Sequence, residues 1–394
     1  YLFSYSGFNE DIGSWEVGNV TNMEEMFYGA ETFNQDISGW DVGNVTDATL
    51  MFWDAFAFDQ DLSNWNVGNV TNMTQMFGNA TAFNGNLSNW DVSQVTTMRQ
   101  MFDGASSFNQ DLSNWDVSSV TSMVEMFYGA TDFNGEIGAW DVSNVRDMRG
   151  MFQVASSFNG DLSGWDVGQV TNMSGMLRGS ERVWAYDGSS WGWTTQSHPY
   201  IFNQDIGSWN TSNVTNMSSM LANATAFDQD LSSWDVSNAL DVSNMLDSTG
   251  LSSANLDSAF QSWSTQAVQS GLTLGVNGLL FCSSQEARRT LEESLGWSIE
   301  GDGFDSGNSL CSYIFFENDE LEDAVEEWMD NPTLAEATYG HISTWDVSRI
   351  TDMNNLFSYS DFNEDISSWE VGNVTDMGSM FEGATAFNQD LSTW

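Results

Sequence analysis

The sequence predicts an α/β solenoid whose coils are 25 residues long, each with one short parallel strand and one short helix. Phe residues that begin variants of F-N-x-D-[IL] recur every 25 residues from Phe8 to Phe158, and a Trp follows each of them by seven positions. A fixed period of this length is typical of solenoids, in which each repeat buries its apolar face against its neighbours. The next step, from Phe158 to Phe202, is 44 residues, which indicates an insertion, and Phe227 begins the ninth coil.

The apolar pattern within one coil predicts both elements. In the segment 37–42, Trp40 and Val42 are two residues apart, so they lie on one side of a short strand. In the segment 20–30, apolar residues recur at spacings that fit one face of a two-turn helix, and Gly29 is placed to end it. We therefore expect a strand over 37–42 and a helix over 20–30, repeated along the chain.

Composition excludes several classes of function. The chain has 56 acidic and 8 basic residues, a net charge of -48, and every basic residue is Arg. Such a chain repels phosphate, so binding to nucleic acids and to anionic membranes is disfavoured, whereas cation binding or a salty medium fits. Hydrophobic residues make up 41% of the sequence, including 19 Trp and 26 Phe, which is enough for a sizeable core.

The chain divides into four parts. We expect a repeat array over 1–250, with nine coils and an insertion at about 181–200, followed by a C-terminal cap over 251–315. An amphipathic helix then begins near Asn318 and ends before Pro332; it is the N-terminal cap of a next module over 316–344. A second array begins at 345 and runs to 394.

A second, longer period links the two arrays. Residues 1–40 match residues 355–394 at 29 of 40 positions, and the sequence of Leu2–Thr21 is nearly identical to that of Leu356–Thr375. The match repeats residues that are particular to the first coil and differ in the other coils. It therefore indicates tandem modules with a period of 354 residues. It predicts that the polypeptide before Tyr1 resembles the segment 316–354.

Cys282 and Cys311 are the only cysteines, and neither has metal-site spacing. Because the acidic, Lys-free repeat chain fits an extracellular setting, we expect a disulfide between them; two buried thiols are the alternative.

The repeat carries a resemblance to a known family. The segment 108–130 reads FNQDLSNWDVSSVTSMVEMFYGA, and many of these positions recur together along the chain. This pattern resembles the repeat of BspA-type leucine-rich-repeat surface proteins, which is also known from mycoplasma-type surface lipoproteins. The resemblance implies a leucine-rich-repeat-like right-handed coil, display at the cell surface, and adhesion or surface-structural roles.

Acidic residues form two columns that are candidate Ca²⁺ sites, since this hard cation prefers carboxylate and carbonyl oxygens. The first column includes Asp41, Asp91, Asp116, Asp141 and Asp166, and the second includes Asp36, Asp61, Asp111 and Asp161. In the alternative interpretation the second column caps turns through hydrogen bonds to the backbone, and salt screens the first.

The insertion is a candidate binding loop. It carries five aromatic residues among Gly and Ser, which suit stacking on sugars or anchoring a partner protein, or else packing against the outer side of the repeats. They are Trp184, Tyr186, Trp191, Trp193 and Tyr200. Many N-x-[ST] sequons arise from the N-V-T and N-M-[ST] motifs of the repeat consensus. Asn79, Asn86 and Asn223 lie outside these motifs and are the preferred candidates for glycans.

Catalysis has little support, because His198 and His341 have no nucleophile in a supporting context. We expect an extracellular structural protein, not an enzyme, whose tandem modules associate head to tail into a cell-surface fibre. No cofactor other than Ca²⁺ is suggested, and no apolar run is long enough to cross a membrane. The alternative is a Ca²⁺-assisted adhesin or a module that binds surface glycans or proteins.

Overall fold

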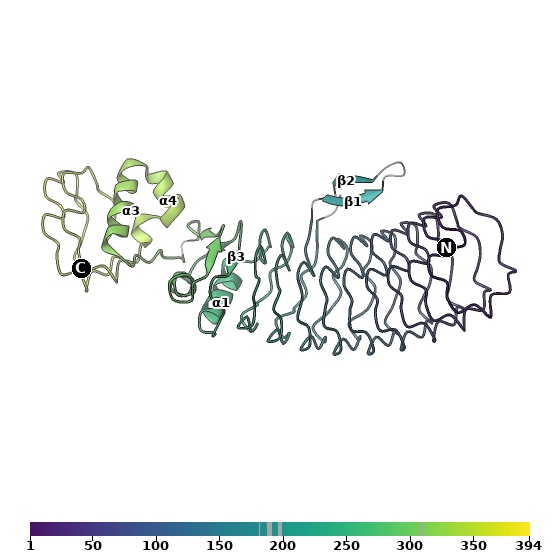
Figure 1. Cartoon of the computed structure of the whole chain (residues 1–394). Helices are drawn as coiled ribbons and strands as arrows, with labels where there is room; N and C mark the ends of the chain where they lie inside the picture. The colour runs from purple at the N-terminus through teal and green to yellow at the C-terminus, as the bar shows by residue number, and fades with distance from the viewer. Residues whose placement is uncertain (181, 187–190, 196–198, 309) are drawn as a thin grey trace.

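The structure, a computed structural model, describes residues 1–180, 199–308 and 310–394 with their side chains, and the backbone of residues 182–186 and 191–195. Successive 25-residue segments lie one above the next as coils of a single stack, and α1 and β3 stand at its far end (Figure 1). A second, shorter stack follows helices α3 and α4.

The helices and strands lie outside the coils. The β-strands are β1 (Arg182–Tyr186), β2 (Trp191–Thr195), β3 (Thr273–Gly275), β4 (Leu280–Phe281), β5 (Ser298–Glu300) and β6 (Gly303–Phe304). The helices are α1 (Ser253–Trp263), α2 (Gln285–Arg289), the π-helical turn η1 (Thr290–Ser294), α3 (Asn318–Asp330), α4 (Pro332–Tyr339) and the 3-10 turn η2 (Ile342–Thr344).

Backbone hydrogen bonds join each coil to the next, as the coil that contains Phe102 shows. The amides of Met98, Gln100, Phe102 and Gly104 donate to carbonyls 24 residues later, with N···O distances of 2.7 to 3.2 Å. Isolated parallel β-bridges also link neighbouring coils, for example residues 97 and 122. Each coil therefore completes the hydrogen bonding of its neighbour.

The helix expected at 20–30 and its repeats is absent from the described coils, where a series of turns replaces it. In most of these turn segments two residues have a left-handed backbone; in the coil of Phe102, φ is 53° at Gln100 and 69° at Gly104. A left-handed residue interrupts the right-handed helix and directs its amide toward the next coil. The segment expected as a strand, 37–42, also forms turns, in which Trp40 N donates to Ile37 O at 3.1 Å.

Three columns of stacked aromatic rings fill the core of the first stack. The centroids of Phe102 and Phe127 are 5.5 Å apart, those of Phe108 and Phe133 are 6.0 Å apart, and those of Trp115 and Trp140 are 6.3 Å apart. These rings are buried. The 25-residue spacing of Phe and Trp in the sequence therefore corresponds to ring contacts between successive coils.

Hydrogen bonds from polar side chains also join neighbouring coils. The indole N–H of Trp115 donates to Leu87 O of the preceding coil at 3.0 Å. Asn84 Oδ1 accepts the backbone N–H of Asn109 at 3.0 Å and the side-chain amide of Gln110 at 2.8 Å. The same bonds recur in other coils, so the Asn, Gln and Trp of the repeat are needed to satisfy polar groups between coils.

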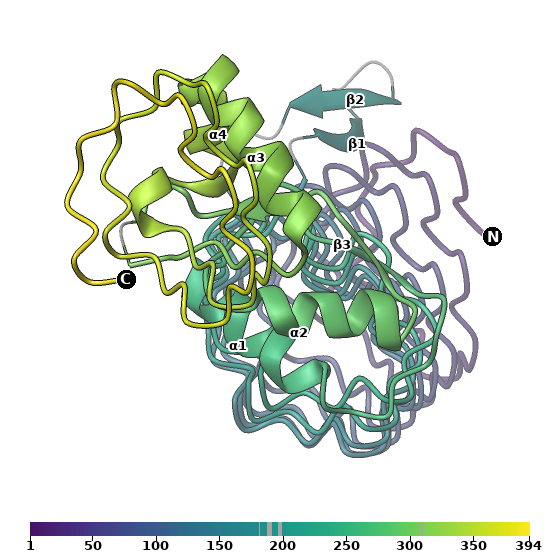
Figure 2. The same cartoon turned by 90° about the vertical axis from the view of Figure 1, so that its left-hand side faces the viewer.

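Caps cover the apolar end of the first stack. Seen along the stack, α1 and α2 lie across the end of the coils (Figure 2). In α1 the apolar side chains of Leu256, Phe260 and Trp263 are fully buried and join the core of the array. Behind them, β3 pairs with β5 and β4 pairs with β6, both in parallel. This is the closure that a stack of repeats requires.

Asp103 is an acidic residue whose surroundings disfavour the ionised form of its carboxyl group. It is half-buried, and its carboxylate accepts a hydrogen bond from the Gln100 side-chain amide at 3.0 Å. Burial, with a further contribution from the negative charge of Glu125, raises the pKa of Asp103 to about 7. The ionised form is therefore disfavoured in the folded state, so Asp103 lowers stability as the pH rises from about 4 toward 7.

We predict that Asp103→Asn stabilises the protein at pH 8 and changes its stability little at pH 2.5, where the carboxyl is protonated in both the folded and the unfolded state. The expected gain at pH 8 is roughly 1–3 kcal/mol, since one pKa unit corresponds to about 1.4 kcal/mol and residual solvent screening reduces the effect. Thermal unfolding at the two pH values measures it. Asp161→Asn is the control, because its carboxylate is exposed and its pKa is lowered by hydrogen bonds from Ser163, so the pH dependence has the opposite sign. Equal changes at both pH values for Asp103→Asn would refute this assignment.

Candidate functional site

The structure joins the two arrays through a short linker, and this junction is the candidate functional site. Tyr313 O accepts the N–H of Asp346 at 2.8 Å, and the N–H of Phe315 donates to Asp346 O at 3.0 Å. On the first array's side, the N–H of Ile314 donates to Gln285 Oε1 at 2.8 Å. The linker therefore extends the second array in the manner of a preceding coil while the cap of the first array holds it.

Two arginines connect the caps around Phe316. The guanidinium of Arg289 contacts Glu317 at 3.0 Å, and that of Arg349 contacts Glu286 at 2.7 Å. Both guanidinium groups also lie over the Phe316 ring, 4.7 and 4.9 Å from its centroid. Cation–π contacts of this kind add to ion pairs that, being largely exposed, are individually weak.

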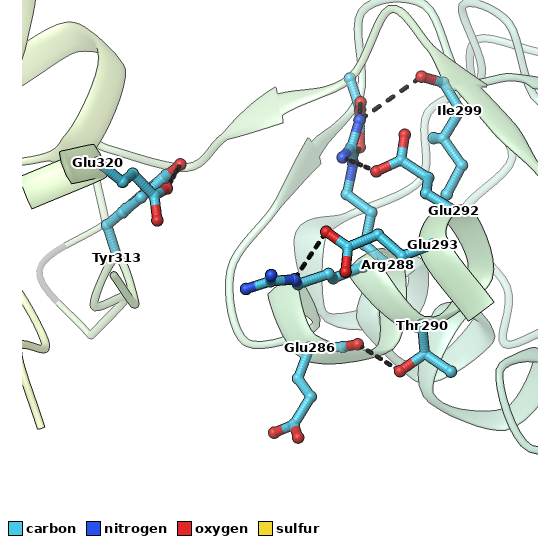
Figure 3. A network of polar contacts seen from close by, with 10 residues as sticks. Glu286, Arg288, Thr290, Glu292, Glu293, Ile299, Tyr313 and Glu320 are labelled. Atoms are coloured by element: carbon cyan, nitrogen blue, oxygen red, sulfur yellow. Dashed lines mark hydrogen bonds and ion pairs between the residues drawn. The ribbon is translucent and has the colours of Figure 1, made fainter. Parts of the chain in front are cut away.

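A more buried network supports this contact from the first array. Arg288 contacts Asp302 at 2.7 Å and Glu292 at 2.6 Å, and the Asp302 side chain is only 2% exposed. Burial lowers the pKa of Arg288, but the hydrogen bond to Asp302 and the negative charges of Asp302 and Glu292 together outweigh it and raise the pKa overall. Figure 3 shows Arg288 between Glu292 and the carbonyl of Ile299. The network holds α2, which carries Gln285, Glu286 and Arg289, and the following turn η1 in place.

On the second array's side, Glu320 holds the linker. Its carboxylate accepts the Tyr313 hydroxyl at 3.1 Å (Figure 3). It also accepts the N–H of Phe316 at 3.0 Å. Burial raises the pKa of Tyr313, and the charge of Glu320 adds to the effect, so the phenol stays protonated and donates. Helix α3 is thereby fixed to the segment that leads into the second array.

The predicted disulfide between Cys282 and Cys311 is present in the structure, with the two Cα atoms 5.0 Å apart. Asp257, a buried residue of α1, positions the first cysteine. Its carboxylate accepts the N–H of Cys282 at 3.0 Å, the N–H of Ser283 at 2.7 Å and the hydroxyls of Ser283 and Ser284. Cys282, at one end of the disulfide, is therefore hydrogen-bonded directly to α1, the cap helix of the first array.

Members of both acidic columns make hydrogen bonds that serve turns. Asp36 Oδ1 accepts the N–H of Ser38 at 3.0 Å, and Asp41 Oδ1 accepts the N–H of Gly43 at 3.1 Å. The same contact to the residue two positions later is made by Asp91, Asp116, Asp141 and Asp166 in the first column and by Asp61, Asp111 and Asp161 in the second. Ca²⁺ binding by these columns stays a prediction.

The charge of these carboxylates is favoured in part by their own turns. Hydrogen bonds from the hydroxyl and the backbone N–H of the serine two residues later lower the pKa of Asp36, Asp91 and Asp141. Among the residues that the structure describes, no group of three or more His, Cys, Asp or Glu side chains is arranged to hold a metal ion.

The aromatic insertion is described only in part. Trp184 and Tyr186 belong to β1 and are paired in register with Trp193 and Trp191 of β2, but these four side chains lie outside the described residues. Figure 1 shows the β1–β2 hairpin extending from the side of the stack.

Tyr200, the fifth aromatic residue assigned to the insertion, is a core residue, which corrects its assignment to an exposed binding loop. Its side chain is buried, and its hydroxyl donates to Phe152 O at 3.1 Å. It lies just before Phe202, where the chain rejoins the stack, so its ring packs among the coils.

The three candidate glycan sites are half-buried. Asn79 donates its side-chain amide to Asp54 Oδ1 at 2.9 Å, and Asn86 Oδ1 accepts the N–H of Ser88 at 2.9 Å. Asn223 has a left-handed backbone with φ of 60°. Their modification stays a prediction.

Sequence reasoning missed the junction residues Gln285, Glu286, Arg289, Phe316 and Arg349. A compositional signal was present: three of the eight arginines, residues 288, 289 and 349, flank the boundary between the modules. In a chain with 56 acidic residues, scarce positive charges placed together mark a contact.

The coils, their caps and their repetition beyond the junction define a tandem-repeat protein. Comparison with family models specifies it further: the model described as "Mycoplasma protein of unknown function, DUF285" matches residues 1–90, 83–191, 195–274 and 311–394. The chain therefore belongs to this family, and its matches cover the arrays, the second cap and the part of the first cap that contains α1.

Searches of curated proteins and of solved structures returned no match. In the described part of the chain, no helix combines the length and the apolar character needed to cross a membrane.

We predict that Arg289→Ala combined with Arg349→Ala loosens the junction without unfolding either array. The double variant removes the two ion pairs and the two cation–π contacts of the junction, together with the Arg289–Glu293 pair inside the first cap. The expected loss is about 1–3 kcal/mol in total. Small-angle X-ray scattering of the whole chain should show a larger maximum dimension, or a broader distribution of dimensions, than the wild type.

Arg99→Ala combined with Arg146→Ala is the charge-matched control, because both residues are exposed on the first stack, away from the junction. An unchanged scattering profile in the junction variant, or an equal change in the control, would contradict the role of the junction.

Proposed function

We propose that this chain is part of an extracellular structural protein whose capped modules follow one another and associate head to tail into a cell-surface fibre. In this proposal each array is a leucine-rich-repeat-like solenoid of the BspA type, and the protein is not an enzyme. The observation that carries the proposal is the junction: the linker 313–315 pairs with the second array while Ile314 is hydrogen-bonded to Gln285 of the first cap.

A fibre requires defined contacts between modules, and the junction supplies the features of such a contact. It combines backbone pairing, ion pairs and a ring shared by two guanidinium groups, so that the modules are held by several independent contacts. Contacts that run head to tail without closing a ring produce filaments. The repeat at an interval of 354 residues supports the same arrangement, because it places equivalent coils in successive modules.

The charge and the disulfide support an extracellular setting. A net charge of -48 keeps such rods from associating side by side at low ionic strength. Disulfides persist in oxidising surroundings, and the Cys282–Cys311 bond is formed in the structure. Without Lys, the chain has no side-chain amine for isopeptide cross-links, so a fibre would depend on packing, disulfides, ions or glycans.

The second candidate is a Ca²⁺-assisted adhesin or a glycan-binding surface module. The observation that favours it is the β1–β2 hairpin, which extends from the stack and carries Trp184 opposite Trp193. A hairpin that extends from the stack and is rich in aromatic residues suits recognition better than support.

Imaging of the native material by electron microscopy separates the two candidates. The structural proposal predicts regular fibres whose axial repeat equals the length of one module. Isolated rods with no regular axial repeat, together with binding to glycans that deletion of residues 182–198 abolishes, would reject the fibre and support the adhesin.

A further inference from the structure

The disulfide closes a loop at the point where the chain leaves the first array. Cys282 directly follows β4, Cys311 stands two residues before Tyr313 of the linker, and the two cysteines are 29 positions apart in sequence. The loop between them, residues 283–310, contains α2, η1, β5 and β6. We call this segment the docking loop.

The first array's contacts to the second array described above come from the docking loop. Gln285 accepts the N–H of Ile314, Glu286 pairs with Arg349, and Arg289 pairs with Glu317. The ring of Phe304 lies 5.3 Å from that of Tyr313 in an edge-on arrangement. The part of the first module that holds the second is therefore the part that the disulfide encloses.

We propose that the Cys282–Cys311 disulfide is a load bypass that lets the chain carry tension while the docking loop stays folded. Tension along the polypeptide passes from Cys282 to Cys311 through the sulfur bridge, so residues 283–310 are not stretched. This inference rests on the proposed function, since only a load-bearing strand experiences tension in use, but the load path follows from the covalent connectivity.

Both ends of the bypass are fixed to folded elements. At Cys282, the carboxylate of Asp257 accepts backbone N–H groups, which ties the bridge to α1 and the core of the first array. Beyond Cys311, Tyr313 and Phe315 pair with Asp346 and so enter the second array. The path between the two cores thus consists of one sulfur bridge and a few residues.

Without the bridge, the same tension would run through the docking loop. It would pull Gln285, Glu286 and Arg289 away from their partners, whose ion pairs are largely exposed and individually weak. The aromatic columns of the coils are far better buried. The junction is then expected to yield first and to release the extended length of the loop, about 100 Å.

Stretching the whole chain by its two ends in optical tweezers tests the bypass. In the disulfide-bonded wild type no release of about 100 Å should precede the unfolding of the coils, and the fully stretched chain should stay about 100 Å shorter than the reduced chain. Cys282→Ser combined with Cys311→Ser should show this release as the first event, before any coil unfolds. Wild-type molecules reduced with dithiothreitol after tethering should do the same, and they begin from the same folded state, so the test does not depend on the folding of the variant.

Arg289→Ala combined with Arg349→Ala, with the disulfide kept, is the matched control: the junction should open at a lower force, again without the release of about 100 Å. If the reduced wild type and the serine variant release the loop only after the coils have unfolded, the loop does not depend on shielding and the bypass is refuted. Failure to find fibres by imaging would reject the proposed function alone, because the tweezers measure a property of the single chain.

Discussion

The structure depends on the contact between one coil and the next. Inside a coil, the turns leave backbone amides such as those of Gln100 and Phe102 without partners in their own segment, and carbonyls of the following coil accept them. The rings of Phe102 and Trp115 likewise find their apolar surroundings in equivalent rings of the neighbouring coils. A single coil could satisfy neither its polar groups nor its apolar surface, so stability is a property of the stack.

This dependence explains which parts of the fold were predictable. The period alone predicts that Phe108 and Trp115 are core residues. A contact between equivalent residues of successive coils requires the same residue type at every repeat, so it is visible in the sequence. The helix expected at 20–30 was not found, since its spacing of Val, Met and Phe also fits a series of turns. What separates the two is the left-handed backbone at positions such as Glu25 and Gln100, with φ of 53° at each, and neither residue type signals it.

The candidate site was predictable only where chemistry is local. Pairing of Cys282 with Cys311 was expected because they are the only two cysteines and the chain has an extracellular character. The contacts of Phe316 with Arg289 and Arg349 instead join residues 27 and 33 positions apart that no period relates. Tyr200 was placed with the insertion because of its neighbours in sequence, although its ring belongs to the core. The acidic columns were recognised, and turn hydrogen bonds were offered as the alternative for the second column, which includes Asp36. The equivalent bonds of the first column, such as that of Asp41, became visible only in the structure.

The central claim, that each coil is held by its neighbours, can be tested through the indole N–H groups. The N–H of Trp65, Trp90, Trp115 and Trp140 each donates to a carbonyl of the preceding coil, whereas Trp15 is 40% exposed. Hydrogen exchange followed by NMR should therefore show uniformly slow exchange at the four buried indoles and fast exchange at Trp15. Exchange at Trp90 and Trp115 as fast as that of Trp15, in protein that is otherwise folded, would contradict the account.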